Sequence, residues 1–131
     1  MSIRSFVDTT SLNLSAAPVI LLPQQSGSTF IMTKNAAVTH VLPSPTIAGI
    51  KYRIYNSSVV AVITRFDSGG NSLVGSWTQV NGTKTITFLS RYINFTATSQ
   101  QGDYIDLISD GTLWRVEGQT GDPAGVGLAF Q

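Results

Sequence analysis

The sequence has no cysteine, one histidine and few charged residues. Charged residues make up 11% of the 131 residues, whereas roughly 25% is typical of soluble domains. Without cysteine the chain has no disulfide bonds and no thiolate metal sites. The single histidine, His40, has no second ligand at metal-binding spacing and no recognisable nucleophile beside it. We therefore predict a structural role for His40, no bound metal and no cofactor.

Long apolar runs, phosphate-binding motifs and basic clusters are also absent. No run approaches the roughly 18 apolar residues of a membrane-spanning helix, and residues 1–8 lack the apolar core of a secretory signal. No Gly-rich phosphate loop and no Gly-X-Ser-X-Gly motif occurs. The formal net charge is +1, and the eight basic residues are scattered along the chain. We therefore expect no membrane partner and no nucleic-acid partner.

The acidic residues do not form a catalytic pair in the sequence. Asp103 and Asp106 are three residues apart, an offset that places them on opposite faces of a strand. We predict that Asp103 caps a turn and that Asp106 is exposed or lies at an interface. Asp67 begins a Ser- and Gly-rich loop that lacks the further acidic ligands of an EF-hand calcium site. Together these features predict that the protein is not an enzyme and has no catalytic residues.

What the sequence does contain is typical of β-structure. It has 15 serines and 15 threonines; Thr favours strands, and both residues are frequent in turns. No segment shows the 3.6-residue apolar period of an amphipathic helix, and short β-branched and aromatic runs are separated by turn formers. We predict an all-β fold, an antiparallel, jelly-roll-like β-sandwich of about eight or nine short strands. The predicted strands are Val19–Leu22, Thr29–Met32, Thr39–Leu42, Lys51–Asn56, Val60–Phe66, Lys84–Leu89, Tyr92–Thr98, Tyr104–Ser109 and Thr112–Glu117.

The most informative stretch is a hairpin in which apolar and polar residues alternate on both sides of Asp110-Gly111. This dipeptide suits a two-residue type I′ turn, because both central residues of that turn need positive φ. Ile105 and Leu107 alternate with other residues before the turn, as Trp114 does after it. We predict that Asp110 and Gly111 are structural turn residues and that Trp114 is buried in the core.

The sequence indicates one domain with two distinct ends. Residues 1–15 form a polar N-terminal arm, residues 16–117 the predicted sandwich, and residues 118–131 a Gly-rich C-terminal tail. Residues 59–63 are apolar at every position, which is expected of a central strand covered on both faces or of a strand whose second face meets a neighbouring subunit. Low charge, this run and apolar residues in both ends favour a homotrimer. A Thr-rich monomeric domain with frayed termini is the alternative.

Two aromatic residues are candidates for surface contacts. Trp77 lies between two glycine-containing turns, so we expect it to be the most exposed aromatic residue. Tyr55 and Tyr52 alternate in their predicted strand and therefore lie on opposite faces. Trp77 and Tyr55 could bind a receptor or a glycan, because aromatic rings bury a large area at low entropic cost. For each of them, packing in the core is the interpretation that the sequence favours over ligand contact.

Four segments together resemble a module common in structural proteins of tailed bacteriophages and other large DNA viruses. Its Gly-X-Thr-Phe, Val-X-Leu-Pro and Gly-X-X-Tyr-X-Phe/Ile strands are similar to residues 26–32, 37–43 and 48–56. Its Gly-Asp-X-Val-X-Leu-X-Ser-Asp-Gly-X-X-Trp ending is similar to residues 102–116. The resemblance covers most of the chain, but it describes strands and turns and names no functional residue.

Such modules occur as head decoration proteins, head fibres and tail-fibre or spike domains, commonly as β-sandwich trimers. The resemblance therefore implies a non-enzymatic virion structural protein, a capsid decoration or head protein that stabilises the particle surface as a homotrimer. Its partners would be further copies of itself and the capsid or other virion proteins, and it would be assembled in the host cytoplasm and located in the virion. The first alternative is a receptor- or glycan-binding tip of a viral fibre or spike, with a host glycan as partner. A cellular β-sandwich accessory domain is the second.

Overall fold

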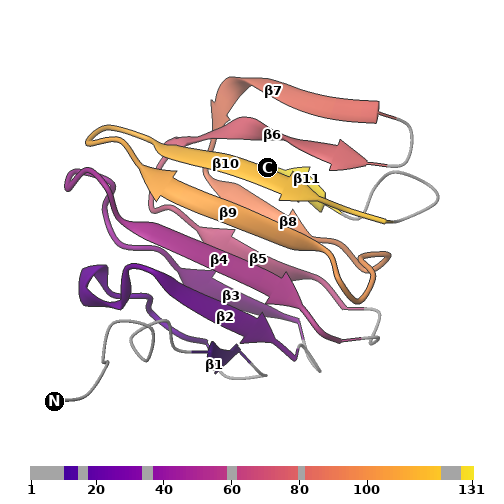
Figure 1. Ribbon diagram of the computed structural model, residues 1–131. Helices are drawn as coiled ribbons and strands as arrows, with labels where there is room; N and C mark the ends of the chain where they lie inside the picture. The colour runs from indigo at the N-terminus through magenta and orange to yellow at the C-terminus, as the bar shows by residue number, and fades with distance from the viewer. Residues whose placement is uncertain (1–10, 15–17, 34–36, 59–61, 80–81, 122–127) are drawn as a thin grey trace, which may run out of the picture.

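Two β-sheets packed face to face make up the fold (Figure 1). The computed structural model describes residues 11–14, 18–33, 37–58, 62–79, 82–121 and 128–131. These ranges contain eleven strands, one short 3-10 turn and no α-helix, so the prediction of an all-β sandwich is confirmed. Within the same ranges, no helix is long and apolar enough to cross a membrane.

The two sheets differ in size. The larger sheet contains, in spatial order, β1 (Ser11–Leu14), β2 (Ser28–Met32), β4 (Lys51–Asn56), β9 (Tyr104–Ser109), β10 (Trp114–Gln119), β6 (Leu73–Gln79) and β7 (Gly82–Ser90). The smaller sheet contains β11 (Leu128–Phe130), β8 (Tyr92–Phe95), β5 (Thr64–Asp67) and β3 (Val38–Val41). The 3-10 turn η1 (Pro23–Gln25) precedes β2. The larger sheet thus has seven described strands and the smaller sheet four.

Both sheets are mixed rather than purely antiparallel. Among the described strands, β1–β2, β2–β4, β6–β10 and β3–β5 are parallel pairs, whereas jelly rolls are antiparallel. The chain alternates between sheets from β2 to β6. When the chain crosses to the opposite sheet and comes back, the new strand runs in the same direction as the strand before the crossing. A hairpin, in contrast, reverses the direction of the chain. Hydrophobic alternation has a period of two in either case, so the sequence pattern does not reveal strand direction.

Strands also form in places where none is predicted. β1 lies within the segment predicted as an N-terminal arm, and β11 within the predicted tail. β11 pairs with β8, and its Leu128 is buried. Of the apolar run 59–63, residues 59–61 lie outside the described residues, as do 1–10 and 122–127. Ile63 is 42% exposed, and β5 begins only at Thr64.

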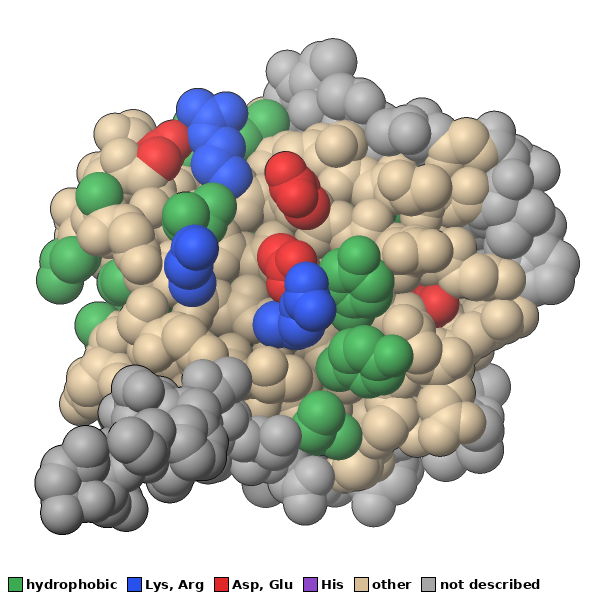
Figure 2. Space-filling model, viewed as in Figure 1, with side chains coloured by type: hydrophobic (Ala, Val, Ile, Leu, Met, Phe, Trp, Pro, Cys, Tyr) green, Lys and Arg blue, Asp and Glu red, His purple; other side chains and the backbone are tan. Residues whose placement is uncertain are grey.

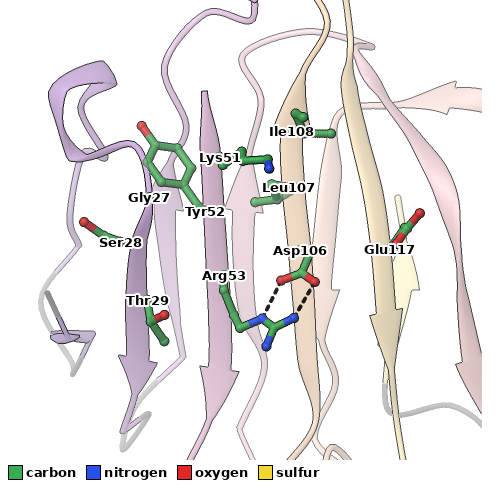
Figure 3. A pocket seen from close by; sticks show the side chains of 10 residues that line it. All are labelled: Gly27, Ser28, Thr29, Lys51, Tyr52, Arg53, Asp106, Leu107, Ile108 and Glu117. Carbon is green, nitrogen blue, oxygen red and sulfur yellow. Dashed lines mark hydrogen bonds and ion pairs between the residues drawn. The ribbon is translucent and has the colours of Figure 1, made fainter. Parts of the chain in front are cut away.

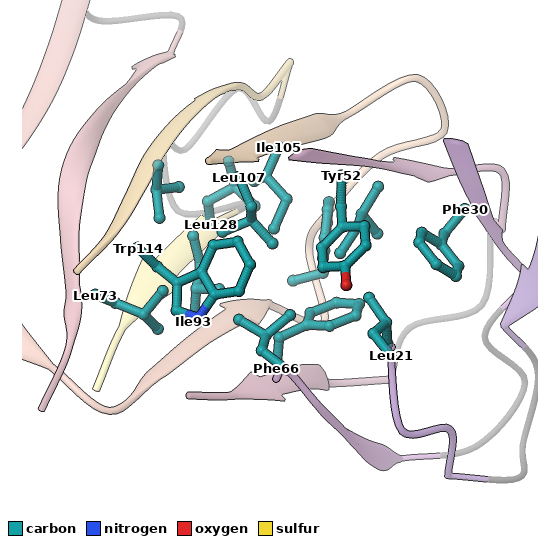
Figure 4. Close-up of a cluster of buried hydrophobic side chains, with 14 of the residues drawn as sticks. Leu21, Phe30, Tyr52, Phe66, Leu73, Ile93, Ile105, Leu107, Trp114 and Leu128 are labelled. Carbon is teal, nitrogen blue, oxygen red and sulfur yellow. The ribbon is translucent and has the colours of Figure 1, made fainter. Parts of the chain in front are cut away.

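The core between the sheets follows the alternation read from the sequence (Figure 4). Ile105 and Leu107 point inward from β9. Trp114, predicted as a core residue, is fully buried, and its ring stacks on that of Tyr52 with 5.7 Å between ring centres. The indole Nε1 donates a hydrogen bond to the Pro43 carbonyl at 3.0 Å. Burial also raises the pKa of the Tyr52 phenol to about 12.

The turn of the hairpin differs from the prediction. Strands β9 and β10 are joined by four residues, 110–113, rather than by two. No described residue other than glycine has positive φ, which excludes a type I′ turn at Asp110. The Asp110 carboxylate instead accepts hydrogen bonds from the backbone N–H groups of Thr112 and Leu113 at 2.9 and 2.7 Å. An aspartate that bonds to the backbone two residues ahead stabilises its own type of turn, and Gly111 supplies the positive φ of 95°.

His40 is buried in β3 and holds the backbone of a neighbouring segment. Its Nδ1 accepts a hydrogen bond from the backbone N–H of Val19 at 3.0 Å, and its ring lies 5.3 Å from that of Phe66. Because Nδ1 accepts, the neutral ring carries its proton on Nε2. Burial lowers the pKa of His40 to about 4. The imidazole is therefore neutral in the folded protein at ordinary pH.

Candidate functional site on the outer face of the larger sheet

Charged and aromatic side chains gather on the outer face of the larger sheet, over β4, β9 and β10 (Figure 2). The alternation that buries the inner positions turns the intervening residues outward. Arg53 and Tyr55 project from β4, Tyr104 and Asp106 from β9, and Glu117 from β10. These five residues define what we call the outer-face site. Ser and Thr are common in β2 and β6 on either side, so shorter side chains flank the longer ones.

An ion pair lies at the centre of the outer-face site. Arg53 and Asp106 are directly opposite each other in the antiparallel β4–β9 ladder. The guanidinium Nε and Nη2 donate to Asp106 Oδ1 and Oδ2 at 2.7 and 2.8 Å (Figure 3). The hydrogen bond to Asp106 raises the pKa of Arg53. Two parallel bonds fix both side chains, so the centre of the site is preorganised.

Two tyrosines lie next to this ion pair. Tyr55 and Tyr104 are opposite each other in the same ladder. Their rings are parallel within 7°, with 6.3 Å between the ring centres. The Arg53 guanidinium carbon lies 4.8 Å from the centre of the Tyr104 ring. Tyr55, a predicted contact residue, is 37% exposed. The sequence analysis does not identify Tyr104, because its pairing with Tyr55 depends on which strands become neighbours.

Glu117 brings a second carboxylate to the site. It lies opposite Asp106 in the β9–β10 ladder, and no ion pair involves it within the part of the chain that the structure describes. A two-residue turn at Asp110-Gly111 would instead place Arg115 opposite Asp106. The longer loop shifts the partner of Asp106 by two residues, from Arg115 to Glu117, so the faces of the strands are not exchanged. The burial pattern is therefore as predicted, while the charge pairing is not.

Two hollows flank the central ion pair. One, of about 450 Å³, includes Thr29, Lys51 and Ile108 in its lining (Figure 3). The other, of about 210 Å³, is lined by Tyr104 together with side chains of β6 and β10. Asp106 and Glu117 belong to the lining of both. The two hollows therefore form one elongated binding surface across the strands.

Trp77 belongs to the lining of the smaller hollow, but its ring is buried, so the expectation that it is the most exposed aromatic residue is wrong. It belongs to β6, a strand absent from the predicted set, and is only 4% exposed. Its ring stacks on Phe130 of β11, with 5.3 Å between ring centres. Gly75 suggests a turn in the sequence, but it is a strand residue that lies opposite Val116. A Cβ atom at Gly75 would come within 2.0 Å of the Val116 carbonyl oxygen, so this glycine permits close approach of two strands.

Asp103 lies on the other side of the hairpin and is 4% exposed. Its carboxylate accepts four hydrogen bonds of 2.8–2.9 Å, from the Ser99 and Thr120 hydroxyls and from the backbone N–H groups of Gln100 and Gly121. Asp103 therefore joins a turn to the end of β10, in agreement with its predicted capping role. Saturation by these donors leaves it no evident part in surface chemistry.

Two further aspartates of the described ranges, Asp67 and Asp110, make ion pairs. Asp67 binds the Arg91 guanidinium at 2.8 and 3.1 Å and accepts a hydrogen bond from the backbone N–H of Gly69. The hydrogen bond from Arg91 lowers the pKa of Asp67. The backbone hydrogen bonds to Asp110, aided by Arg115, lower the pKa of that carboxyl to about 2. No group of three or more metal-ligating His, Cys, Asp or Glu residues occurs in the described ranges.

The chain matches no family model and no curated protein. The function must therefore be argued from the residues themselves. The outer-face site combines a fixed ion pair, a tyrosine pair and an unpaired carboxylate on an open, hollowed surface. Such an arrangement offers an aromatic pair and mixed hydrogen-bonding groups to a ligand.

Proposed function

We propose that this chain is a non-enzymatic structural protein of a virus particle, which assembles as a homotrimer and decorates the capsid. The resemblance of residues 26–32, 37–43, 48–56 and 102–116 to virion modules supports the viral context. The observation that carries the assembly part is an uncovered edge of the larger sheet, and apolar side chains at one end support attachment to a surface.

The uncovered edge is β7. This strand has nine residues, lies at the margin of the larger sheet and pairs only with β6 among the described strands (Figure 1). A long exposed edge offers unpaired backbone donors and acceptors, and monomeric proteins usually shorten, cover or charge such edges. A closed symmetric oligomer in which a neighbouring subunit covers β7 removes this liability.

Exposed apolar side chains support a contact at one end of the sandwich. Three segments define this end: the η1 turn, the loop 42–50 and the hairpin loop 110–113 (Figure 1). Leu22 beside η1 is 41% exposed, and Ile47 in the second loop is 59% exposed. Ala48 of the loop 42–50 lies next to Gly111 of the hairpin loop, so these two loops are neighbours in space. Grouped apolar side chains on a surface mark contact sites more often than scattered ones, so we propose that this end faces the capsid.

Absence of catalysis is part of the proposal. Asp106 is held by two bonds to Arg53, and Asp103 is saturated by four donors. His40 is buried and neutral, so it cannot serve as a surface base without a large rearrangement. These arrangements favour structural or binding roles for the groups that acid–base catalysis would use.

Light scattering of the full chain at micromolar concentration tests the assembly. We expect a mass near three times that of one chain, with contacts of roughly 1,200–2,000 Å² between subunits. Leu89→Lys introduces a charge on β7 and should shift the protein towards monomers, whereas Ile108→Lys on β9, a strand inside the sheet, should not. Leu89 and Ile108 are similarly exposed, at 45% and 38%, so the pair is matched. A monomeric wild-type protein would contradict the trimer.

Loading onto virus particles that lack this protein tests the attachment. Ile47→Glu should weaken loading at least tenfold, because a carboxylate would have to be buried at the contact. Tyr55→Glu is the control, since it changes an exposed side chain near the other end of β4, away from the three loops. Equal loading of Ile47→Glu and wild type would refute the proposed capsid-facing end.

A further inference from the structure

We propose that the outer face of β4, β9 and β10 is a binding site for a neutral oligosaccharide. Three features carry this inference: a parallel tyrosine pair, a polar hollow beside it, and a local charge that disfavours anions. The site is independent of the assembly and the viral role proposed above, because it uses neither β7 nor the apolar end of the sandwich.

Tyr55 and Tyr104 supply the apolar part of the site. Their rings are parallel within 7°, and Tyr55 is 37% exposed. Arg53 is fixed by Asp106 and lies 4.8 Å from the centre of the Tyr104 ring, so the Tyr104 ring is held in place before a ligand arrives. One face of a pyranose ring carries mainly C–H groups. Such a face packs against an aromatic ring at low entropic cost, because a tyrosine has only two side-chain torsions.

The smaller hollow supplies the polar part. Besides Tyr104, Ser76, Thr78, Glu117 and Gln119 belong to its lining. These side chains offer hydroxyl, amide and carboxylate groups, which include both donors and acceptors. Each sugar hydroxyl is itself a donor and an acceptor and needs such mixed partners. The Glu117 carboxylate makes no ion pair within the described ranges, so it can accept strong hydrogen bonds from sugar hydroxyls.

The shape of the surface suits a chain of sugars rather than a single one. The hollows on the two sides of the Arg53–Asp106 pair share Asp106 and Glu117. Together they extend from β2 across β4, β9 and β10 to β6. At the usual strand spacing this is roughly 19 Å. An oligosaccharide lying across the strands would contact the tyrosine pair and both hollows.

The charges favour a neutral ligand. Arg53 is neutralised by Asp106, and the smaller hollow has Asp106 and Glu117 in its lining but no cation, whereas Lys51 lies in the lining of the larger hollow only. An anionic sugar placed beside Tyr104 would therefore face unfavourable electrostatics. A protein partner fits less well, because Tyr55 and Ile108 are the only large apolar side chains of β4 and β9 that are exposed. A protein interface usually needs a more apolar centre.

Binding of defined probes to the full chain tests the inference. The neutral probes are cellohexaose, maltohexaose, mannohexaose and N-acetylchitohexaose, and the anionic probe is a heparin-derived hexasaccharide, all measured by calorimetry. We expect at least one neutral probe to bind and the heparin probe not to bind. Tyr55→Ala should weaken binding about tenfold. Tyr92→Ala is the matched control, because Tyr92 lies on the smaller sheet and also has guanidinium groups 5.1 and 5.2 Å from its ring centre.

Further variants keep the test decisive. Gln119→Ala should also weaken binding of the neutral probe, and it replaces Tyr55→Ala if circular dichroism shows that variant to be unfolded. Glu117→Gln should weaken binding of the neutral probe less than Tyr55→Ala does, because the amide oxygen still accepts a hydrogen bond but lacks the charge of the carboxylate. Glu117→Lys should admit the heparin probe. Any of four results would overturn the proposal. The first three are no binding of any neutral probe at millimolar concentration, tighter binding of heparin by the wild type, and equal losses in Tyr55→Ala and Tyr92→Ala. The fourth is a change of oligomeric mass in Tyr55→Ala, which would assign this face to a contact between copies.

Discussion

The inner and outer sides of the β9–β10 hairpin accommodate a carboxylate in opposite ways. On the inner side, Asp103 is buried and accepts hydrogen bonds only from hydroxyl and backbone N–H groups. On the outer side, Asp106 is partly exposed and bound by a guanidinium. A buried cation would add a large desolvation cost, whereas neutral donors do not. A chain rich in Ser and Thr and poor in charge can therefore supply the hydrogen bonds of a buried carboxylate from neutral donors. The exposed carboxylate of Asp106 is bound by Arg53 at the surface.

The largest expected effect comes from removing the main aromatic residue of the inner side. Trp114→Ala should lower the free energy of unfolding by about 3–5 kcal/mol, because it leaves a cavity and removes the partner of Tyr52. Urea denaturation monitored by circular dichroism measures the change. A loss below about 1 kcal/mol would mean that Trp114 is not part of the core in solution.

The second effect is a dependence of stability on pH that arises from the interior. His40 has a pKa of about 4 in the folded protein, against 6.5 when exposed. As the pH falls through this window, the unfolded chain binds a proton that the folded protein does not, so stability should decrease by about 3 kcal/mol in total. Urea denaturation between about pH 7 and pH 4 measures it, and His40→Gln should abolish this slope. The carboxyls of Asp67 and Asp110, whose pKa values are lowered, lose their contribution only at still lower pH.

A third experiment measures how much the buried carboxylate of the inner side contributes to the free energy of unfolding. Asp103→Asn keeps the shape of the side chain but replaces one acceptor oxygen by a donor, which would then face a hydroxyl or N–H donor. We expect a loss of about 2 kcal/mol, the scale of buried donors left unsatisfied. The free energy of unfolding in urea is the measurement, and a change within error of zero would show that the buried network is not needed.

The smallest effect is expected on the outer side. Asp106→Asn should cost less than about 1 kcal/mol, because the Arg53 and Asp106 side chains are 50% and 38% exposed and exposed ion pairs contribute little. The difference from wild type should shrink further in high salt. If Asp106→Asn proved as costly as Asp103→Asn, the distinction between the two sides of the hairpin would fail.

Several features of the fold could be predicted from the sequence because they depend on local order. Alternation places Ile105, Leu107 and Trp114 on one face of the hairpin, whatever the neighbouring strands are. This is why their burial is as predicted even though the turn has four residues instead of two. The offset between Asp103 and Asp106 likewise assigns them to opposite sides.

The candidate site was predictable only in part. Tyr55 is expected on a surface and is found there, whereas Trp77 is covered by Phe130 from a strand near the end of the chain. Nothing in the sequence around Trp77 signals this cover. Glu117 could have been placed beside Asp106 only if the loop of four residues had been recognised from the Asp110 side-chain bonds to the backbone.

The sequence by itself determined the β-class, the inward and outward faces of the β9–β10 strands and the shortage of charge. These properties follow from residue type and a period of two, which are independent of long-range pairing. Only the tertiary structure decided strand direction, register and neighbours. Arg53 and Asp106 are 53 residues apart in the chain, and they meet because β4 and β9 lie side by side. The pairing of β4 with β9 depends on how the two whole sheets pack around one core, and no local sequence pattern determines it.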